Sequence, residues 1–129
     1  MPFESGQTLE RTYVVTEEHL AVRYGSGLAA VLSTPALVGF CEETARLLVD
    51  RDLGPGEQSV GASFAVRHLA PTPPGMSIVV RAELVEIEGR RLRFTLEARD
   101  EVETIATGEH VRVVVDGARF AADAAAKSG

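Results

Sequence analysis

Two polar residues of this 129-residue sequence fall where the surrounding pattern calls for apolar side chains. Glu42 shares a helical stripe with Val38 and Ala45, and His68 has the parity of the apolar residues of the strand predicted around it. Both side chains are therefore expected to face the core, each toward the other. A carboxylate and an imidazole on facing elements can activate water or stabilise a developing charge at neutral pH. Thr34, at the predicted start of the helix, adds a hydroxyl near free backbone N–H groups, where a carbonyl oxygen could be polarised.

Each of these residues also has a purely structural interpretation. Glu42 could form an ordinary ion pair with Arg46, four residues further along the helix. His68 could be a core histidine whose ring bonds a backbone carbonyl. Thr34 could serve only as a helix cap. The sequence leaves these alternatives open.

The other reactive side chains form no recognisable site. His110 and Arg112 share one face of the last predicted strand, opposite three valines, and are expected to face solvent or an edge without a catalytic role. Cys41, the one cysteine, lies in the apolar part of the predicted helix and is expected to be a core residue. The three histidines lack HExxH and HxH spacing, so no metal is predicted.

The composition is that of one globular domain. Hydrophobic residues make up 45% of the chain, which is too much for intrinsic disorder, and 13 basic against 19 acidic residues give a net charge of −6. That excess of acid argues against nucleic acid as a partner. The sequence has neither a signal-peptide pattern nor an apolar run long enough for a membrane span, and its single cysteine fits a reducing compartment. A cytoplasmic protein without membrane contact is expected.

The hydrophobic periodicity predicts an α+β fold. A strand over 7–15 and a helix over 36–50 precede four antiparallel strands that end near residue 115. The helix is apolar around most of its circumference and each strand has one apolar face, so a curved sheet wrapped around one central helix satisfies the pattern. A single domain is predicted over 1–117, and residues 118–129 are expected to be a frayed helix or a disordered tail.

Two details of the strands follow from the same pattern. The strand that starts at Gln58 is expected to turn alternate residues toward the helix, namely Val60, Ala62, Phe64, Val66 and His68. Gly108, inside the last strand, is expected to mark a β-bulge.

Four segments of the chain carry a family resemblance. They are TPALVGFCE (34–42), GPGEQSVGASFAVRHLAPTPPG (54–75), AELVEIEGRRLRF (82–94) and ATGEHVRVVV (106–115). The most specific features are the Thr-x7-Glu spacing, the V-x-H-x-A-x-T-P-P-G segment and the EGRRL turn. Together they closely resemble the fluoroacetyl-CoA thioesterase and its relatives among the hotdog-fold thioesterases.

The resemblance implies a hotdog fold, a homodimer with active sites at the subunit interface, and hydrolysis of a small or modest acyl-CoA thioester. It implies that Thr34, Glu42 and His68 match the catalytic threonine, glutamate and histidine of the family. It also implies that Gly61 matches the glycine whose backbone N–H helps to hold the acyl carbonyl. No cofactor is implied beyond the coenzyme A of the substrate. The longer, phenylalanine-bearing lid of the fluoroacetyl enzyme has no counterpart in residues 24–32.

Three questions stay open at this stage. Glu42 could attack the thioester or activate water. The coenzyme A phosphates could be held by Arg90, Arg91 or Arg93, and the sequence does not say which of them; the alternative for these arginines is a solvated strand face. The alternative function is a non-catalytic module of the same fold that binds an acyl thioester or another hydrophobic ligand. An enoyl-CoA hydratase is disfavoured because the sequence has no D-x-N-x-x-H constellation.

Overall fold

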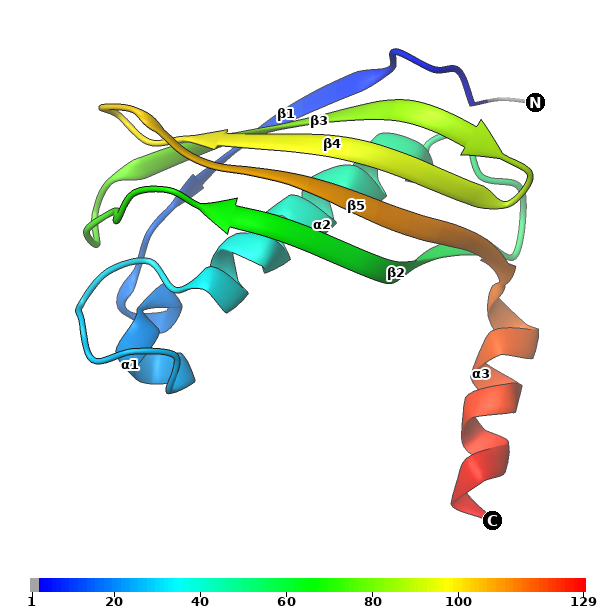
Figure 1. Cartoon of the computed structure of the whole chain (residues 1–129). Coiled ribbons are helices and arrows are strands. Elements are labelled where there is room, and N and C mark those ends of the chain that lie inside the picture. Colours follow the sequence, from blue (N-terminus) through cyan, green and yellow to red (C-terminus); the bar gives the residue numbers. More distant parts are fainter. Residues whose placement is uncertain (1–2) are drawn as a thin grey trace.

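The computed structural model describes residues 3–129 and contains one five-stranded sheet and a long helix that lies against it (Figure 1). The strands are β1 (Thr8–Val14), β2 (Glu57–His68), β3 (Ser77–Glu88), β4 (Arg91–Arg99) and β5 (Thr104–Asp116). The helices are α1 (Ala21–Tyr24), α2 (Thr34–Asp50) and α3 (Gly117–Ala125), with short 3-10 turns at Glu17–His19 and Ala126–Ser128.

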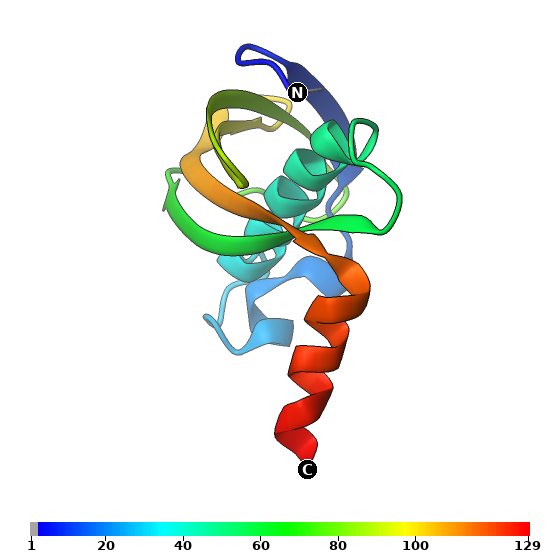
Figure 2. The same ribbon diagram turned by 90° about the vertical axis from the view of Figure 1, so that its right-hand side faces the viewer.

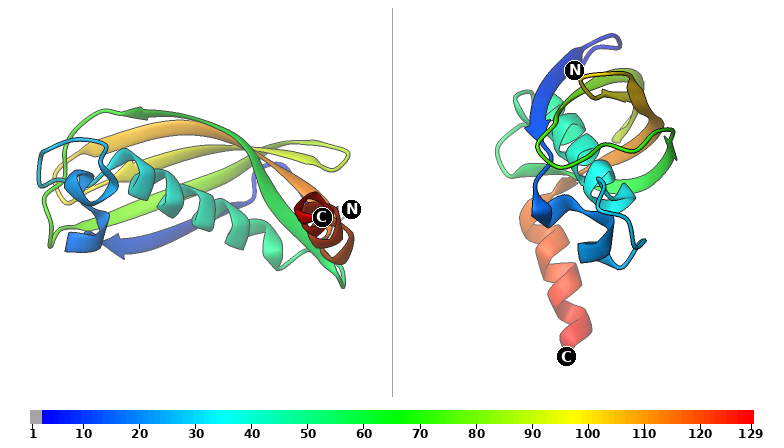
Figure 3. Two further views of the ribbon diagram at one scale, coloured as in Figure 1. Left: turned by 90° about the horizontal axis from the view of Figure 1, so that it is seen from below. Right: turned by 90° about the vertical axis from the view of Figure 1, so that its left-hand side faces the viewer.

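The sheet is antiparallel throughout and has the strand order β1-β3-β4-β5-β2. It curves around α2, which lies across its concave face (Figure 2; Figure 3). The predicted α+β architecture, a curved sheet around one central helix, is confirmed. The order also leaves β1 and β2 at the two edges, so β2 ends the sheet on the side that carries His68.

The hydrophobic core lies between α2 and the central strands. It contains Leu37, Cys41, Ala45 and Leu48 of the helix, and Ile78, Val80, Leu84, Leu92 and Phe94 of β3 and β4. Burial raises the pKa of the Cys41 thiol to about 12, so this cysteine is the inert core residue that the sequence predicted.

Helix α2 is capped by the residue before Thr34. Ser33 is the N-cap, and its Oγ accepts a hydrogen bond of 3.1 Å from the backbone N–H of Ala36. Pro35 follows in the first turn, where its fixed φ suits the helix and its missing N–H costs nothing. Thr34 is thus the first helical residue, and its hydroxyl is free of the capping role.

A bulge in β2 changes which of its residues face α2. The register of β2 against β5 shifts between Gly61 and Ser63, with Gly61 opposite Arg112 and Phe64 opposite His110. Phe64, Val66 and His68 keep the predicted face. Before the bulge the prediction is wrong, because the extra residue reverses the alternation: Ser59 is buried and Gly61 lies against Glu42, in place of Val60 and Ala62.

The bulge predicted at Gly108 is also wrong. Gly108 is paired in regular register with Val66 on one side and Leu96 on the other. Its lack of a side chain serves close packing instead, because a Cβ here would lie 2.9 Å from the Ala65 carbonyl oxygen and 3.0 Å from a ring carbon of Phe64.

The C-terminal residues form helix α3, which points away from the sheet (Figure 1; Figure 2). Asp116 caps this helix, accepting a hydrogen bond of 2.9 Å from the backbone N–H of Arg119. Among residues 3–129, no helix combines the length and the apolarity that a membrane crossing requires.

Candidate active site

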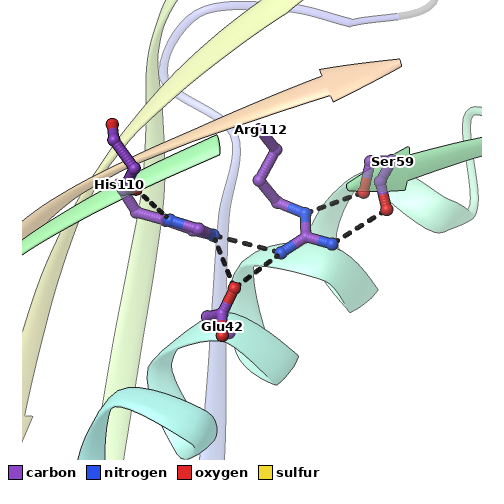
Figure 4. A network of polar contacts seen from close by, with 5 residues as sticks. Glu42, Ser59, His110 and Arg112 are labelled. Atoms are coloured by element: carbon purple, nitrogen blue, oxygen red, sulfur yellow. Dashed lines mark hydrogen bonds and ion pairs between the residues drawn. The ribbon is translucent and has the colours of Figure 1, made fainter. Parts of the chain in front are cut away.

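Glu42 projects from the middle of α2 toward the buried polar residues of β5 (Figure 4). Its Oε2 lies 3.7 Å from Nη1 of Arg112 and 3.9 Å from Nε2 of His110. The Glu42 side chain is 44% exposed, whereas both partners are almost fully buried. Arg46 pairs with Asp50 instead, so the alternative interpretation of Glu42 as half of a helical ion pair is wrong.

Arg112 is held by three hydrogen bonds around its guanidinium group. Nε donates to the Ser59 hydroxyl at 2.8 Å, Nη2 donates to the Ser59 carbonyl at 2.9 Å, and Nη1 donates to His110 Nε2 at 3.1 Å. A cation that is only 5% exposed needs such bonds together with an opposite charge. Glu42 supplies that charge, so the two residues form a half-buried pair whose carboxylate still reaches solvent.

The hydrogen-bond partners of His110 assign it the neutral form and one tautomer. The Ser63 carbonyl can only accept, so Nδ1 carries the hydrogen and donates at 2.8 Å, which leaves Nε2 to accept from Arg112. Burial and the adjacent Arg112 charge lower the pKa of His110. The ring also packs against Phe64, with centroids 4.8 Å apart.

The prediction that His110 and Arg112 face solvent is therefore wrong. They occupy the inner face of β5, opposite the buried Phe94 and Leu92 of β4. Periodicity alone separates the two faces of a strand but does not say which one is covered. The valines on the opposite face suggested the other choice, and the Ser59 and Ser63 contacts that stabilise the buried polar face are not visible in the sequence.

Gly61 lets the β2 backbone approach the Glu42 carboxylate. A Cβ at this position would overlap with Oε2 of Glu42 and would lie 3.5 Å from His110 Cε1 and 3.7 Å from Arg112 Nη1. The absence of a side chain is thus a requirement of the site, and it leaves the main chain of Gly61 beside the carboxylate.

Thr34 and His68 form a second polar cluster at the start of α2. Thr34 Oγ1 and His68 Nδ1 are hydrogen-bonded at 2.8 Å, so Thr34 does more than begin the helix. Burial lowers the pKa of His68. Within residues 3–129, the buried Nε2 of His68 has no hydrogen-bond partner, and an unpartnered buried polar atom in a native fold calls for a functional explanation.

The two clusters lie apart within one chain. Thr34 and Glu42 are separated by about 12 Å along the helix axis, from the rise per residue of an α-helix. Gly61 and His68 are about 20 Å apart along β2, from the rise per residue of a strand. The imidazole beside Glu42 is that of His110, so the expectation that His68 of the same chain faces Glu42 is wrong.

Comparison with known proteins identifies the family. The family model described as "Fluoroacetyl-CoA-specific thioesterase" matches residues 15–118. The chain belongs to this family. The curated fluoroacetyl-CoA thioesterase of Streptantibioticus cattleyicolor is 40% identical over 90 residues, which cover 70% of this chain and 65% of that protein. The match therefore spans slightly less than two thirds of the relative's length.

Solved structures bear out the hotdog fold expected for a fluoroacetyl-CoA thioesterase family member. A structure of the fluoroacetyl-CoA thioesterase superimposes with a TM-score of 0.92 at 32% identity and covers 97% of both chains. A threonine-to-serine variant in complex with acetyl-CoA gives 0.94 at 31%, covering 98% of this chain and 100% of the other. A hot-dog-like protein from Thermanaerovibrio acidaminovorans gives 0.91 at 25%, covering 99% and 95%.

The three arginines expected to bind coenzyme A lie near the β3–β4 turn of this family member. Arg91 and Arg93 alternate with the buried Leu92, so their side chains are on the face opposite Glu42. Arg93 bonds Glu86 and Glu109, both at 3.2 Å, and Arg90 lies 3.7 Å from Glu57. Among the described residues, no group of three or more His, Cys, Asp or Glu side chains is arranged to hold a metal ion.

Proposed function

We propose that this protein is an acyl-CoA thioesterase that hydrolyses a small or modest acyl-CoA to the free acid and coenzyme A. The observation that carries the proposal is the half-exposed Glu42 carboxylate, held beside the Gly61 backbone by the buried cation of Arg112. A carboxylate in such a setting is available for attack on a thioester carbonyl or for activation of water. Family membership supports the same activity.

In the proposed reaction Glu42 takes a proton from a water molecule that attacks the carbonyl, or attacks it directly to form an anhydride that water then hydrolyses to the free acid; in both routes the C–S bond breaks as the thiol leaves. His68 transfers the proton that the departing sulfur requires. Thr34 and the Gly61 N–H stabilise the negative charge that develops on the carbonyl oxygen. These groups perform the chemistry without a cofactor.

We further propose that the active enzyme is a homodimer with the site at the subunit interface. Strand β2 is a 12-residue edge strand, and long edges of this kind are normally covered or paired. Antiparallel pairing of two β2 strands about a two-fold axis is the symmetric way to satisfy this edge. With the axis near the middle of β2, between Gly61 and His68, each Gly61 would lie beside His68 of the partner subunit.

That pairing would also complete the site. Glu42, Gly61 and Arg112 of one subunit would be joined by Thr34 and His68 of the other, which solves the separation found within one chain. His68 Nε2, unpartnered among residues 3–129, would then face the reacting groups. The free-energy cost of burying this nitrogen without a hydrogen bond would thus serve the reaction. The composite site is thus supported by the distances inside the protomer.

Arg90, Arg91 and Arg93 stay candidates for the coenzyme A phosphates. Because Arg91 and Arg93 are on the outer face of the sheet, the pantetheine arm would have to pass around its end to reach them. The cytoplasm is the proposed location, in keeping with the single cysteine and the supply of acyl-CoA substrates.

The test is a panel of acyl-CoA thioesters of increasing chain length, with release of free thiol as the readout. We expect turnover by the wild type and a loss on the order of 10²-fold or more in kcat for Glu42→Gln and His68→Ala. Glu43→Gln is the matched control, because Glu43 is exposed and bonds Tyr13 on the other side of the helix. Equal rates in all variants would remove the proposed chemistry, and tight binding without turnover would identify the non-catalytic module instead.

A further inference from the structure

His110 lies next to the proposed catalytic carboxylate, yet neither the reaction nor the family resemblance gives it a task. It is 1% exposed and faces groups from four elements. Its own strand presents Arg112, and α2 presents Glu42. Strand β2 presents the Ser63 carbonyl and the Phe64 ring, and β4 presents Phe94. Arg112 and Glu42 are thus the charged groups that face this imidazole.

The geometry of Arg112 depends on the neutral form of this ring. Ser59 takes two of the guanidinium nitrogens, Nε and Nη2, and so fixes one edge of the plane. Nη1 remains, and its partners are His110 Nε2 at 3.1 Å and the more distant Glu42 Oε2 at 3.7 Å. An acceptor at Nε2 therefore holds Nη1 in the position from which it faces the carboxylate and the Gly61 backbone.

We propose that His110 is a positioning residue: as the neutral Nδ1–H tautomer it accepts a hydrogen bond from Arg112 and thereby aims Nη1 at Glu42. A proton added at Nε2 would turn this acceptor into a donor that faces another donor. The Arg112 bond would break, and the new N–H would compete for Glu42 Oε2, which lies 3.9 Å away. Arg112 and Glu42 would both leave the arrangement that the reaction uses.

Burial and the Arg112 charge lower the pKa of His110, so the required neutral form prevails at pH 7. Protonation of His110 at lower pH would disrupt the site. We therefore expect the pH–activity profile to fall on its acid side in a way that depends on His110. The activity part of this inference rests on the proposed thioesterase function, whereas the tautomer and its bond to Arg112 do not.

Two amide variants, each of which replaces one ring nitrogen, separate the functions of Nδ1 and Nε2. In His110→Gln the amide oxygen reaches the place of Nε2 and can accept from Arg112, whereas in His110→Asn the amide N–H reaches the place of Nδ1 and can only serve the Ser63 carbonyl. We expect His110→Gln to keep kcat within a few-fold of wild type and to lose the His110-dependent acid limb. We expect His110→Asn to lose kcat on the order of 10²-fold with little change in KM. If His110 had a purely structural role, the variants would show neither a loss confined to kcat nor a changed pH profile.

The second readout is the ¹⁵N NMR spectrum of the His110 ring in the wild type, which needs neither substrate nor a variant. Protonated Nδ1 and unprotonated Nε2 at pH 7 are expected. An Nε2–H tautomer or an imidazolium at pH 7 would overturn the proposal, as would a His110→Asn enzyme as active as His110→Gln. If no thioester is turned over by the wild type, the proposed function fails while the NMR result still decides the tautomer.

Discussion

Two inactive variants should restore activity when they are combined in one dimer. In a mixed dimer of Glu42→Gln and His68→Ala subunits, one interface would combine the two altered residues and the other would combine the intact Glu42 with the intact His68. Within one chain Glu42 lies about 12 Å along the helix axis from Thr34, the residue that bonds His68. A site that uses both Glu42 and His68 therefore requires two subunits. Each mixed dimer should therefore hold one working site of two and show about half of the wild-type rate.

The assay uses two affinity tags of different kinds on co-expressed subunits, with purification through both tags, so that only mixed dimers are measured. Thiol release from the best acyl-CoA of the panel gives the rate per dimer. The matched control pairs Glu42→Gln with the double variant Glu42→Gln/His68→Ala, in which neither interface is intact. That control should stay at the level of the inactive parents.

A mixed dimer that stays as inactive as its parents would refute the reasoning, because it would mean that Glu42 and His68 act within one chain. A chain that is monomeric when purified would refute it earlier, at the step that pairs the β2 edges. Recovery of about half of the rate, in contrast, has no explanation in a single-chain site.

Two further predictions concern the packing and the pH dependence of the same region. In Gly61→Ala the new Cβ would displace the Glu42 carboxylate, so kcat/KM should fall more than 10-fold, as expected for a misplaced reacting group; a variant with wild-type kinetics would contradict the close approach. The control Gly39→Ala adds a Cβ that meets nothing within 4 Å in a helix interior, and it should instead stabilise the fold by about 0.5–1 kcal/mol, measured by urea denaturation. Because burial lowers the pKa of both His68 and His110, the unfolded chain binds more protons below the usual histidine pKa of about 6.5. The free energy of unfolding should therefore be highest above that pH and decline as the pH falls below it, less steeply in His110→Gln. Urea midpoints that do not change between pH 7 and 5 would contradict the lowered pKa values.

The fold could be predicted from the sequence because the elements that form the core have a regular apolar periodicity. Strand β4 buries alternate residues along its whole length, β3 does so from Ile78 to Leu84, before a shift in its register, and α2 buries the face that its wheel predicts. The polar residues of the candidate site could be predicted only in part. Glu42 and His68 stood out as polar side chains in apolar places, whereas His110 and Arg112 were missed because their polar face competed with a run of valines.

The site geometry could not be predicted for two physical reasons. The bulge at Gly61 depends on the register of β2 against β5, which is a property of two strands far apart in the sequence. The separation of Glu42 from His68 depends on where each lies along its own element, and a face assignment carries no information about position along that face. Patterns of two and 3.6 residues therefore predicted that the sheet covers the helix, but not which face of β5 does so, nor which residues meet at the site.

The inner face of the sheet changes from apolar to polar toward the β2 edge. Most strand residues of the core come from β3 and β4, whereas β5 and β2 present His110, Arg112 and Ser59 to the carboxylate of α2. A polar margin of this kind would cost stability if it served only to close the fold, since each group needs a partner and the charges are only partly solvated. It coincides with the long strand edge that has no partner among residues 3–129. The same stretch of β2 therefore explains both where a second subunit would bind and why the reactive groups of one chain stop halfway to a complete site.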